Sequence, residues 1–180
     1  MQRKSFSGMQ CPIARSLERV GEWWSILILR DALNGITRFD EFQKNLGIAP
    51  NMLARRLSGL VEAGLLERRR YNAHPPRDEY MPTERGRDFQ PVLWALLAWG
   101  NRHFAPEGPS LVLIDEATGA IADPVLVDRT SGAEIAPPRF RAAPGPAANE
   151  RLRRRYSRTA GIPRESSRES SRESSQESST

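Results

Sequence analysis

The chain has 180 residues, enough for one domain with a modest hydrophobic core. Its net charge of +5 is unevenly placed: residues 1–136 hold 17 Lys+Arg and 17 Asp+Glu, whereas residues 137–180 hold 10 Arg and 5 Glu. A single cysteine, Cys11, excludes an intrachain disulfide and any multi-cysteine metal site, and fits a reducing compartment.

The first segment, residues 1–10, is expected to be a flexible arm. Arg3 and Lys4 are not followed by an apolar stretch, and the apolar runs of the chain are too short to span a bilayer. We therefore expect a soluble cytoplasmic protein with no membrane partner.

Two helices are predicted to follow. The first begins at Pro12, which suits the first position of a helix, and is broken by Gly21. The second, Trp23–Leu33, is apolar nearly all round and should be buried on most sides. The apolar face of the first helix consists of Ile13, Leu17 and Val20.

The next segment has the pattern of a helix, a turn and a second helix. Thr37 is a good N-cap for a helix that presents Phe39, Phe42 and Leu46 on one face and closes at Gly47. A longer helix is predicted over Pro50–Ala63, although Ala49 is a poor capping residue. A strand over 65–71, a turn with two prolines over 72–77 and a return strand over 78–81 complete a helix-turn-helix with a wing.

The helix from Pro50 to Ala63 has two different faces. At 100° per residue, one face is apolar and should pack inward, while the opposite face is polar. Arg can bridge guanine and Asn can bridge adenine with paired hydrogen bonds, so this polar face is suited to reading base edges. The alternative is an ordinary solvated helix face, but the arginines of the following wing favour DNA binding. The predicted DNA-binding residues are Asn51, Met52, Arg55, Arg56 and Ser58 on the helix, with Arg56 toward its phosphate-facing flank, and Arg68, Arg70 and Arg77 on the wing.

A last long helix is predicted from the Thr83 cap to about Phe104. Its apolar residues cover more of the circumference than one domain core needs, so it is either deeply buried or forms a homodimer seam. Because little of the chain remains to bury it, the seam is favoured. The predicted dimer-interface residues are Phe89, Val92, Leu93, Leu96, Leu97 and Trp99.

Nothing in the sequence predicts catalysis. It has no Gly-rich phosphate loop, no metal-spaced cluster and no nucleophile with a matching base, so we expect no enzyme activity, no metal and no cofactor. His74 and His103 are expected to be surface residues. Cys11 precedes a helix whose dipole favours a thiolate, so it is either a redox sensor or an inert half-buried thiol.

Six sequence blocks carry a family resemblance. They are Cys11-Pro-Ile-Ala-Arg, Trp24 with Ile28-Leu-Arg-Asp, Arg38-Phe-x-Glu-Phe, Gly47-Ile-x-Pro-Asn-Met-Leu, Arg56-Leu-x-x-Leu-x-x-Ala-Gly-Leu and Tyr80-x-x-Thr-x-x-Gly. In order and spacing they resemble the HxlR-type family of bacterial winged-helix transcriptional regulators, over about residues 11–104.

The resemblance implies a homodimer that binds an inverted repeat in double-stranded DNA through the Pro50–Ala63 helix. Repression is favoured over activation, and a small-molecule or redox effector is implied, in some relatives through a cysteine at the position of Cys11. The alternative is a winged-helix module that contacts another protein. The chain departs from the family at Ala49, where Ser is frequent, and at Glu22-Trp23-Trp24, where Gly-Lys-Trp is frequent.

The predicted fold is mainly α with a small β wing. It comprises the arm (residues 1–10), the DNA-binding and dimerisation domain (11–104), a small β extension (105–136) and a disordered basic low-complexity tail (137–180) with RESS repeats. The extension should form two hairpins that resemble a zinc ribbon but cannot bind zinc, because its turns are Thr118-Gly119 and Ser131-Gly132 without cysteine.

Overall fold

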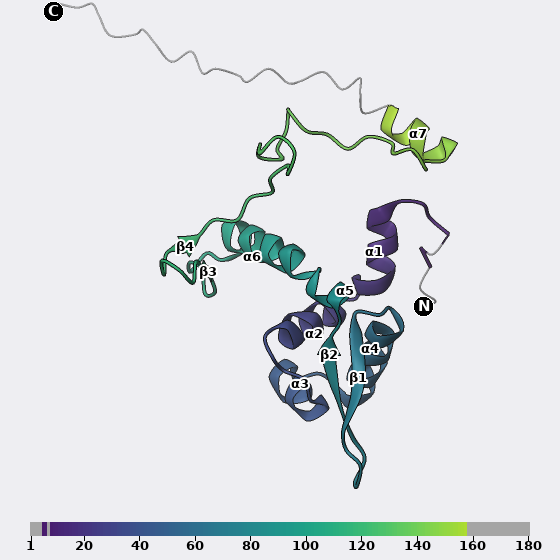
Figure 1. Cartoon of the computed structure of the whole chain (residues 1–180), viewed down its shortest axis with the longest axis vertical. Coiled ribbons are helices and arrows are strands. Elements are labelled where there is room, and N and C mark those ends of the chain that lie inside the picture. The colour runs from purple at the N-terminus through teal and green to yellow at the C-terminus, as the bar shows by residue number, and fades with distance from the viewer. Residues whose placement is uncertain (1–4, 7, 158–180) are drawn as a thin grey trace, which may run out of the picture. The chain divides into compact units, whose positions relative to one another are not determined.

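The computed structural model describes residues 5–6 and 8–157, and the chain divides into two compact units, residues 1–141 and 142–180. In the first unit, helices and a β-hairpin form the winged helix-turn-helix expected from the sequence (Figure 1). Its elements are α1 (Pro12–Val20), α2 (Trp23–Leu33), α3 (Phe39–Leu46), α4 (Pro50–Glu62), β1 (Leu66–Asn72), β2 (Arg77–Pro82), α5 (Glu84–Arg87), α6 (Gln90–Phe104), β3 (Leu113–Ile114) and β4 (Ile121–Ala122).

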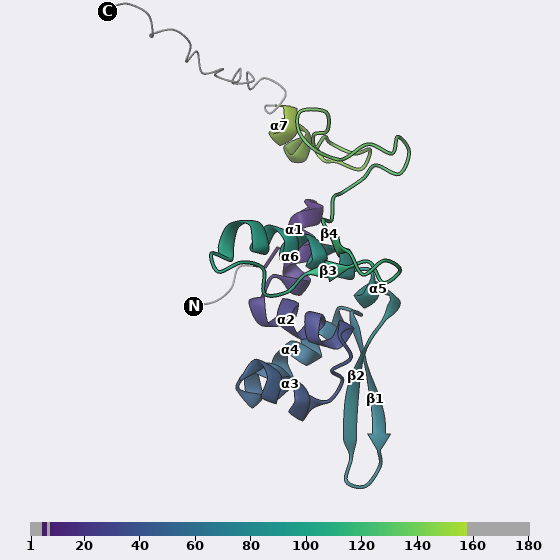
Figure 2. The ribbon, with the colours of Figure 1, turned by 90° about the vertical axis from the view of Figure 1, so that its left-hand side faces the viewer.

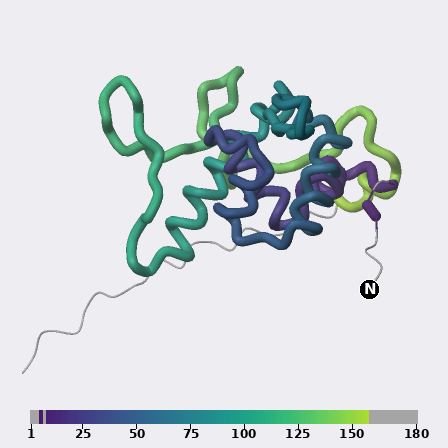
Figure 3. The backbone as a smooth tube through the Cα atoms, turned by 90° about the horizontal axis from the view of Figure 1, so that it is seen from below, coloured from purple at the N-terminus to yellow at the C-terminus, as the bar shows by residue number. Residues whose placement is uncertain are grey.

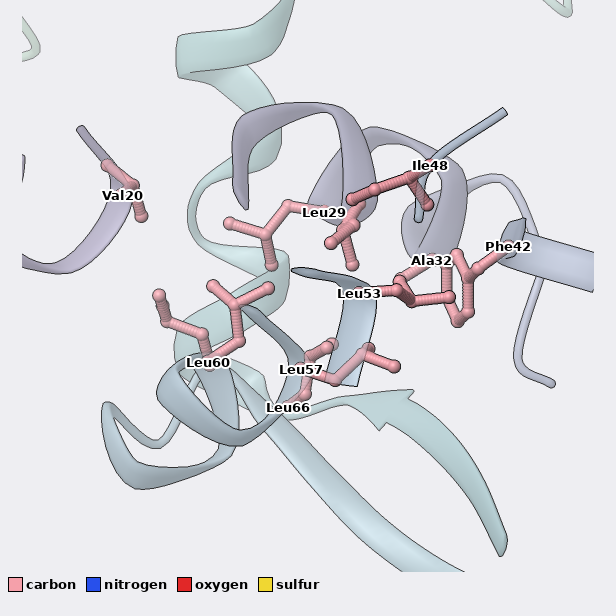
Figure 4. Close-up of a cluster of buried hydrophobic side chains, with 11 residues drawn as sticks. Val20, Leu29, Ala32, Phe42, Ile48, Leu53, Leu57, Leu60 and Leu66 are labelled. Atoms are coloured by element: carbon pink, nitrogen blue, oxygen red, sulfur yellow. The ribbon is translucent and has the colours of Figure 1, made fainter. Parts of the chain in front are cut away.

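One apolar cluster holds the winged helix-turn-helix together. Side chains from α2, α3, α4 and β1 point toward one another in it (Figure 4). Burying each large aliphatic side chain contributes about 1.5–3 kcal/mol. The largest fully buried side chains are Phe42, Ile28, Leu29, Leu53, Leu57, Leu60 and Leu66, which confirms the inward face predicted for α4.

The first two helices are less buried than the sequence predicts. In α1, Val20 is buried but Ile13 and Leu17 are exposed. In α2, Trp23 is 75% exposed, so the prediction that this helix is buried on most sides is wrong at its first residue. The preceding segment is tied to α1, because the Ser5 hydroxyl and the Phe6 amide both donate to the Glu18 carboxylate, at 2.9 and 2.8 Å.

The wing is an antiparallel hairpin of β1 and β2 that extends past the helices in both ribbon views (Figures 1 and 2). Thr37, predicted to cap α3, instead accepts a hydrogen bond of 2.8 Å from the Tyr80 amide of β2. Helix α3 begins at Phe39, and the Arg38 amide donates to the Glu41 carboxylate at 3.1 Å. The segment before α3 thus joins the edge of the wing.

The predicted long helix after the wing is broken in two. Thr83 caps α5 as expected, since its hydroxyl accepts from the Gly86 amide at 3.1 Å. The Asp88 amide still donates to the Glu84 carbonyl at 2.9 Å, the Phe89 amide bonds the Gly86 carbonyl in a tighter turn, and α6 begins at Gln90. Pro91 explains the break, because proline has no amide to bond the preceding turn and is tolerated only at the start of a helix.

The extension forms two hairpins, which the backbone trace shows as successive loops after α6 (Figure 3). Their turns share the pattern Asp-x-x-(Thr/Ser)-Gly, and the glycines, Gly119 and Gly132, have positive φ. A hydrogen bond from the Ala117 amide and then one from the Thr118 hydroxyl lower the pKa of Asp115. The Ser131 hydroxyl and amide lower the pKa of Asp128 in the same way. Side-chain and backbone hydrogen bonds therefore hold these turns.

The second unit contains helix α7 (Glu150–Ser157). The prediction that order stops at Pro137 is therefore wrong over these eight residues. Asn149 caps the helix, since its side-chain carbonyl accepts from the Leu152 amide at 2.9 Å, and Arg153 bonds the carbonyl of Ala148 at 2.9 Å. Helix α7 carries four arginines and one glutamate. The RESS repeats lie outside the described residues.

Candidate nucleic-acid interface

Helix α4 presents its polar face to solvent because its apolar face builds the core. Leu53, Leu57 and Leu60 are buried, which leaves Asn51, Arg55 and Ser58 exposed on the other side. Arg55 makes no hydrogen bond or ion pair within the described part of the chain. Two donors suited to base edges, Asn51 and Arg55, are therefore accessible about one helical turn apart. Met52 is half-buried against the core and contributes less surface.

Arg56 is held inward, whereas the sequence placed it on the phosphate-facing flank. One of its terminal nitrogens (Nη2) lies 2.7 Å from a carboxylate oxygen of Glu22, the residue before α2, and its side chain is only 16% exposed. The ion pair joins residues 34 positions apart, so no helical wheel of α4 alone can reveal it. A carboxylate at Glu22, next to the apolar segment 23–33, is the sequence signal that could have indicated it.

The wing arginines are paired rather than free. Arg70 Nε donates to Asp78 Oδ1 at 2.8 Å, and Arg68 Nε donates to Asp78 Oδ2 at 2.7 Å. Hydrogen bonds from Arg70 and then Arg68 lower the pKa of Asp78, and the same carboxylate raises the pKa of Arg70. Because the pKa of the folded carboxyl is lowered, its stabilising contribution is complete at neutral pH and is lost only as the pH falls through that lowered pKa.

Arg77 and His74 lie near the tip of the wing and are exposed. Arg77 has no hydrogen bond or ion pair with any residue that the structure describes, so its charge is available to a phosphate. Arg69 points to the opposite face of β1 and pairs with Glu67 at 2.8 Å. The wing thus carries one unpaired and three paired arginines.

Arg38 is an interface candidate that sequence reasoning missed. Its guanidinium lies 4.8 Å from the centre of the Tyr71 ring, and its backbone bridges to Glu79. A cation seated on a wing aromatic remains able to contact phosphate. The pairing of this loop with β2 comes from tertiary structure, and no local pattern marks it.

A shallow polar cleft of about 330 Å³ lies between α1, α2 and α4. Acidic and basic side chains are balanced in its lining, so it is not a funnel for anions. Arg55 lines this cleft and is also exposed to solvent. The charged lining residues are Glu18, Arg19, Glu22, Arg55, Arg56 and Glu62.

Helix α6 has no buried residue. Val92, Leu96 and Trp99 are 46%, 42% and 53% exposed and recur at helical spacing along one stripe. Phe89 packs partly against the core. Leu97 faces the extension, where it lines a cleft with Leu113 and Ile121, and Leu93 is half-buried. Val92, Leu96 and Trp99 therefore form one exposed apolar stripe on α6, and Trp94 and Phe104 of the same helix are exposed as well.

Cys11 is the N-cap residue of α1 and is half-buried, with no hydrogen bond from its side chain to the helix. Among the residues that the structure describes, no group of three or more His, Cys, Asp or Glu side chains is placed to hold a metal ion. No helix in the described part of the chain is long and apolar enough to cross a membrane.

Comparison with known proteins agrees with this architecture. The model of the HxlR-like helix-turn-helix family matches residues 19–108. The HTH-type transcriptional regulator Rv3095 of Mycobacterium tuberculosis is 41% identical over 141 residues, which cover 78% of this chain and 89% of that protein.

Two solved structures are also similar. A candidate transcription factor of Pseudomonas aeruginosa, PA1374, is 54% identical, with a TM-score of 0.60 over 81% of this chain and 99% of the other. A second candidate transcription factor, PA1607, is 37% identical, with a TM-score of 0.70 over 78% of this chain and 99% of the other.

Proposed function

Because this chain belongs to the HxlR-like helix-turn-helix family, and is thus a transcriptional regulator of that type, we propose that it acts as a homodimeric repressor on an inverted-repeat operator. The family consists of DNA-binding regulators and not of enzymes. The observation that carries the proposal is the position of Asn51 and Arg55, exposed on α4 and accompanied by the cations of the wing.

In this proposal α4 lies in the major groove as the recognition helix. Arg55 reads guanine and Asn51 reads adenine, while Ser58 adds an adaptable hydrogen-bonding group. The wing contacts phosphate through Arg77, with Arg68 and Arg70 behind it, and sets the register of the helix on the duplex. Arg56 does not contact DNA in this proposal, because its ion pair with Glu22 stabilises the fold.

The apolar stripe of α6 supports a homodimer. An isolated chain would leave Val92, Leu96 and Trp99 in water, together with Ile13 and Leu17 of α1. A two-fold axis along α6 would cover the stripe with its own copy. It would also present two α4 helices to half-sites about 34–36 Å apart, which is one turn of DNA.

Repression is the simpler outcome for such a dimer. A protein that covers its operator excludes other proteins from that DNA without any further contact surface, whereas activation requires a second surface for the transcription machinery.

Selection of bound sequences from random duplex DNA at physiological salt tests the proposal. We expect an inverted-repeat motif. Arg55→Ala should cost about 1–3 kcal/mol on that motif and relax the preference at one base pair per half-site. Arg102→Ala removes an exposed cation from α6 instead of α4. As the matched control, it should leave the preference for the motif unchanged. If no motif is recovered, the chain is a protein-interaction module; if Arg55→Ala weakens motif and random DNA equally, Arg55 does not read bases.

A further inference from the structure

On the wing, the carboxylate of Asp78 forms ion pairs with two arginines, Arg68 and Arg70. Arg68 and Arg70 alternate along β1 and therefore lie on the same face of the hairpin. Asp78 stands directly opposite Arg70 and diagonal to Arg68 in the pairing of β1 with β2. The arginine side chains are 56% and 53% exposed, but the Asp78 side chain is only 13% exposed. The carboxylate is thus covered by the two guanidinium groups.

This arrangement changes what the arginines offer to DNA. A free arginine gains a phosphate and releases a condensed counterion from the duplex. Arg68 and Arg70 must first give up, or share, hydrogen bonds of 2.7 and 2.8 Å to Asp78. The local charge of the three groups is +1 rather than +2. The attraction of this part of the wing to phosphate is therefore reduced for every duplex, whatever its sequence.

We propose that Asp78 is an internal counterion that restrains the wing from binding DNA non-specifically, so that Arg68 and Arg70 engage phosphate only when α4 has seated the protein on its operator. The inference rests on the proposed function and adds a residue that sets specificity without touching a base. On the operator, the phosphates adjacent to the groove are held near the wing for as long as α4 is bound. Their high local concentration lets them compete with Asp78 for the two arginines.

The geometry separates Asp78 from the other wing carboxylates. Glu67 pairs with Arg69 on the opposite face of β1. Glu79, next to Asp78, has no hydrogen bond or ion pair from its side chain to any described residue, and lies opposite Arg69 in the pairing. Asp78→Asn and Glu79→Gln therefore remove the same charge from the same strand, but only the first releases two arginines.

The experiment measures affinity of the full chain for a random-sequence duplex and for the selected operator between 50 and 200 mM salt. Asp78→Asn should steepen the salt dependence by about one to two units of slope, because each phosphate contact contributes about 0.9. Affinity for random DNA should rise on the order of five- to tenfold at 0.1 M salt. Affinity for the operator should rise less, so the ratio of operator to random affinity should fall.

Two further arms keep the result interpretable. In an Arg68→Gln/Arg70→Gln background, Asp78→Asn should have no effect beyond that of Glu79→Gln. Thermal unfolding checks that the wing variants are folded; if Asp78→Asn unfolds at a lower temperature, Asp78→Ser replaces it in the same measurements.

Three outcomes would overturn the inference. Asp78→Asn could behave as Glu79→Gln does, which would reduce Asp78 to a contributor of net charge. It could weaken random DNA binding, which would mean that Asp78 orders the arginines for phosphate. It could raise operator and random affinity by the same factor, which would remove the role in specificity. Failure of the wild type to select any motif would instead overturn the proposed function.

Discussion

Helices α4 and α6 are of similar length, 13 and 15 residues, and both are rich in leucine, yet the chain uses them in opposite ways. Helix α4 buries Leu53, Leu57 and Leu60, whereas α6 buries no residue. The difference lies in the polar residues. An outward face with Asn51 and Arg55 marks a helix with one apolar partner, inside the chain. In the proposed dimer, a second copy covers the apolar surface that the chain itself leaves exposed on α6.

The largest effect should come from the buried side of this comparison. Leu57→Ala should lower the free energy of unfolding by about 2–5 kcal/mol, because it leaves a cavity in a closely packed core. Ser58→Ala, on the outward face of the same helix, should change it by less than about 0.5 kcal/mol. Denaturant unfolding followed by circular dichroism measures both. Equal effects at the two positions would mean that α4 is not anchored by its apolar face.

Leu96→Asp tests whether the exposed apolar stripe of α6 is an interface between copies of the chain. If the α6 stripe forms the dimer seam, this change buries an unpaired carboxylate between copies and should raise the dissociation constant at least about a hundredfold, or about 3 kcal/mol. Sedimentation at micromolar concentration measures the change. Arg102→Asp, which places a carboxylate on the side of α6 that faces the extension, should remain dimeric although it changes the net charge by more. Wild type sedimenting as a monomer would contradict the seam itself.

A third helix sharpens the comparison, because α7 is also without a buried residue but is basic rather than apolar. Truncation after Arg141 should leave the selected DNA motif unchanged. It should also reduce low-salt affinity for random DNA severalfold, since it removes eight arginines against five glutamates, the four arginines of α7 among them. Filter binding with operator and random duplexes separates the two effects. A change in the motif would place readout outside α4.

The smallest effect concerns Cys11, whose role as a redox sensor remains a prediction. Its position at the start of α1, the helix that carries the exposed Ile13 and Leu17, would let an adduct disturb the seam. Cys11→Ser should bind the operator as wild type does, but should not be released by diamide. Electrophoretic mobility shift with and without the reagent measures this difference. Retention of wild type on DNA in diamide would leave Cys11 a structural residue.

The sequence predicted those parts of the fold that local chemistry determines. Pro50 and Gly64 bracket α4, and the Pro-Pro tip defines the wing, so both elements were predicted within a residue or two of their ends. The α5–α6 break and α7 also had local signals, namely Pro91 and the Asn149 cap. Around α7 the proline-rich composition predicts disorder, whereas the Asn149 cap indicates a helix.

The pairings at the candidate interface could not be predicted in this way. Glu22 meets Arg56 across 34 positions, and Asp78 meets Arg68 across 10. Such ion pairs depend on how α2 sits against α4 and on the register of β1 with β2. A helical wheel or a strand pattern identifies which arginines are exposed on their own element. It does not identify which of them form an ion pair with a carboxylate that is distant in sequence.

The turns of the extension have a chemical consequence for the whole protein. Asp115 with Thr118, and Asp128 with Ser131, are held by hydrogen bonds to oxygen atoms, which neither alkylating reagents nor mild oxidants attack. With one cysteine in the chain, a thiol-specific reagent should consume one equivalent per chain, and chelators should not change that stoichiometry. Each protomer therefore offers the oxidants of its surroundings a single, countable thiol target.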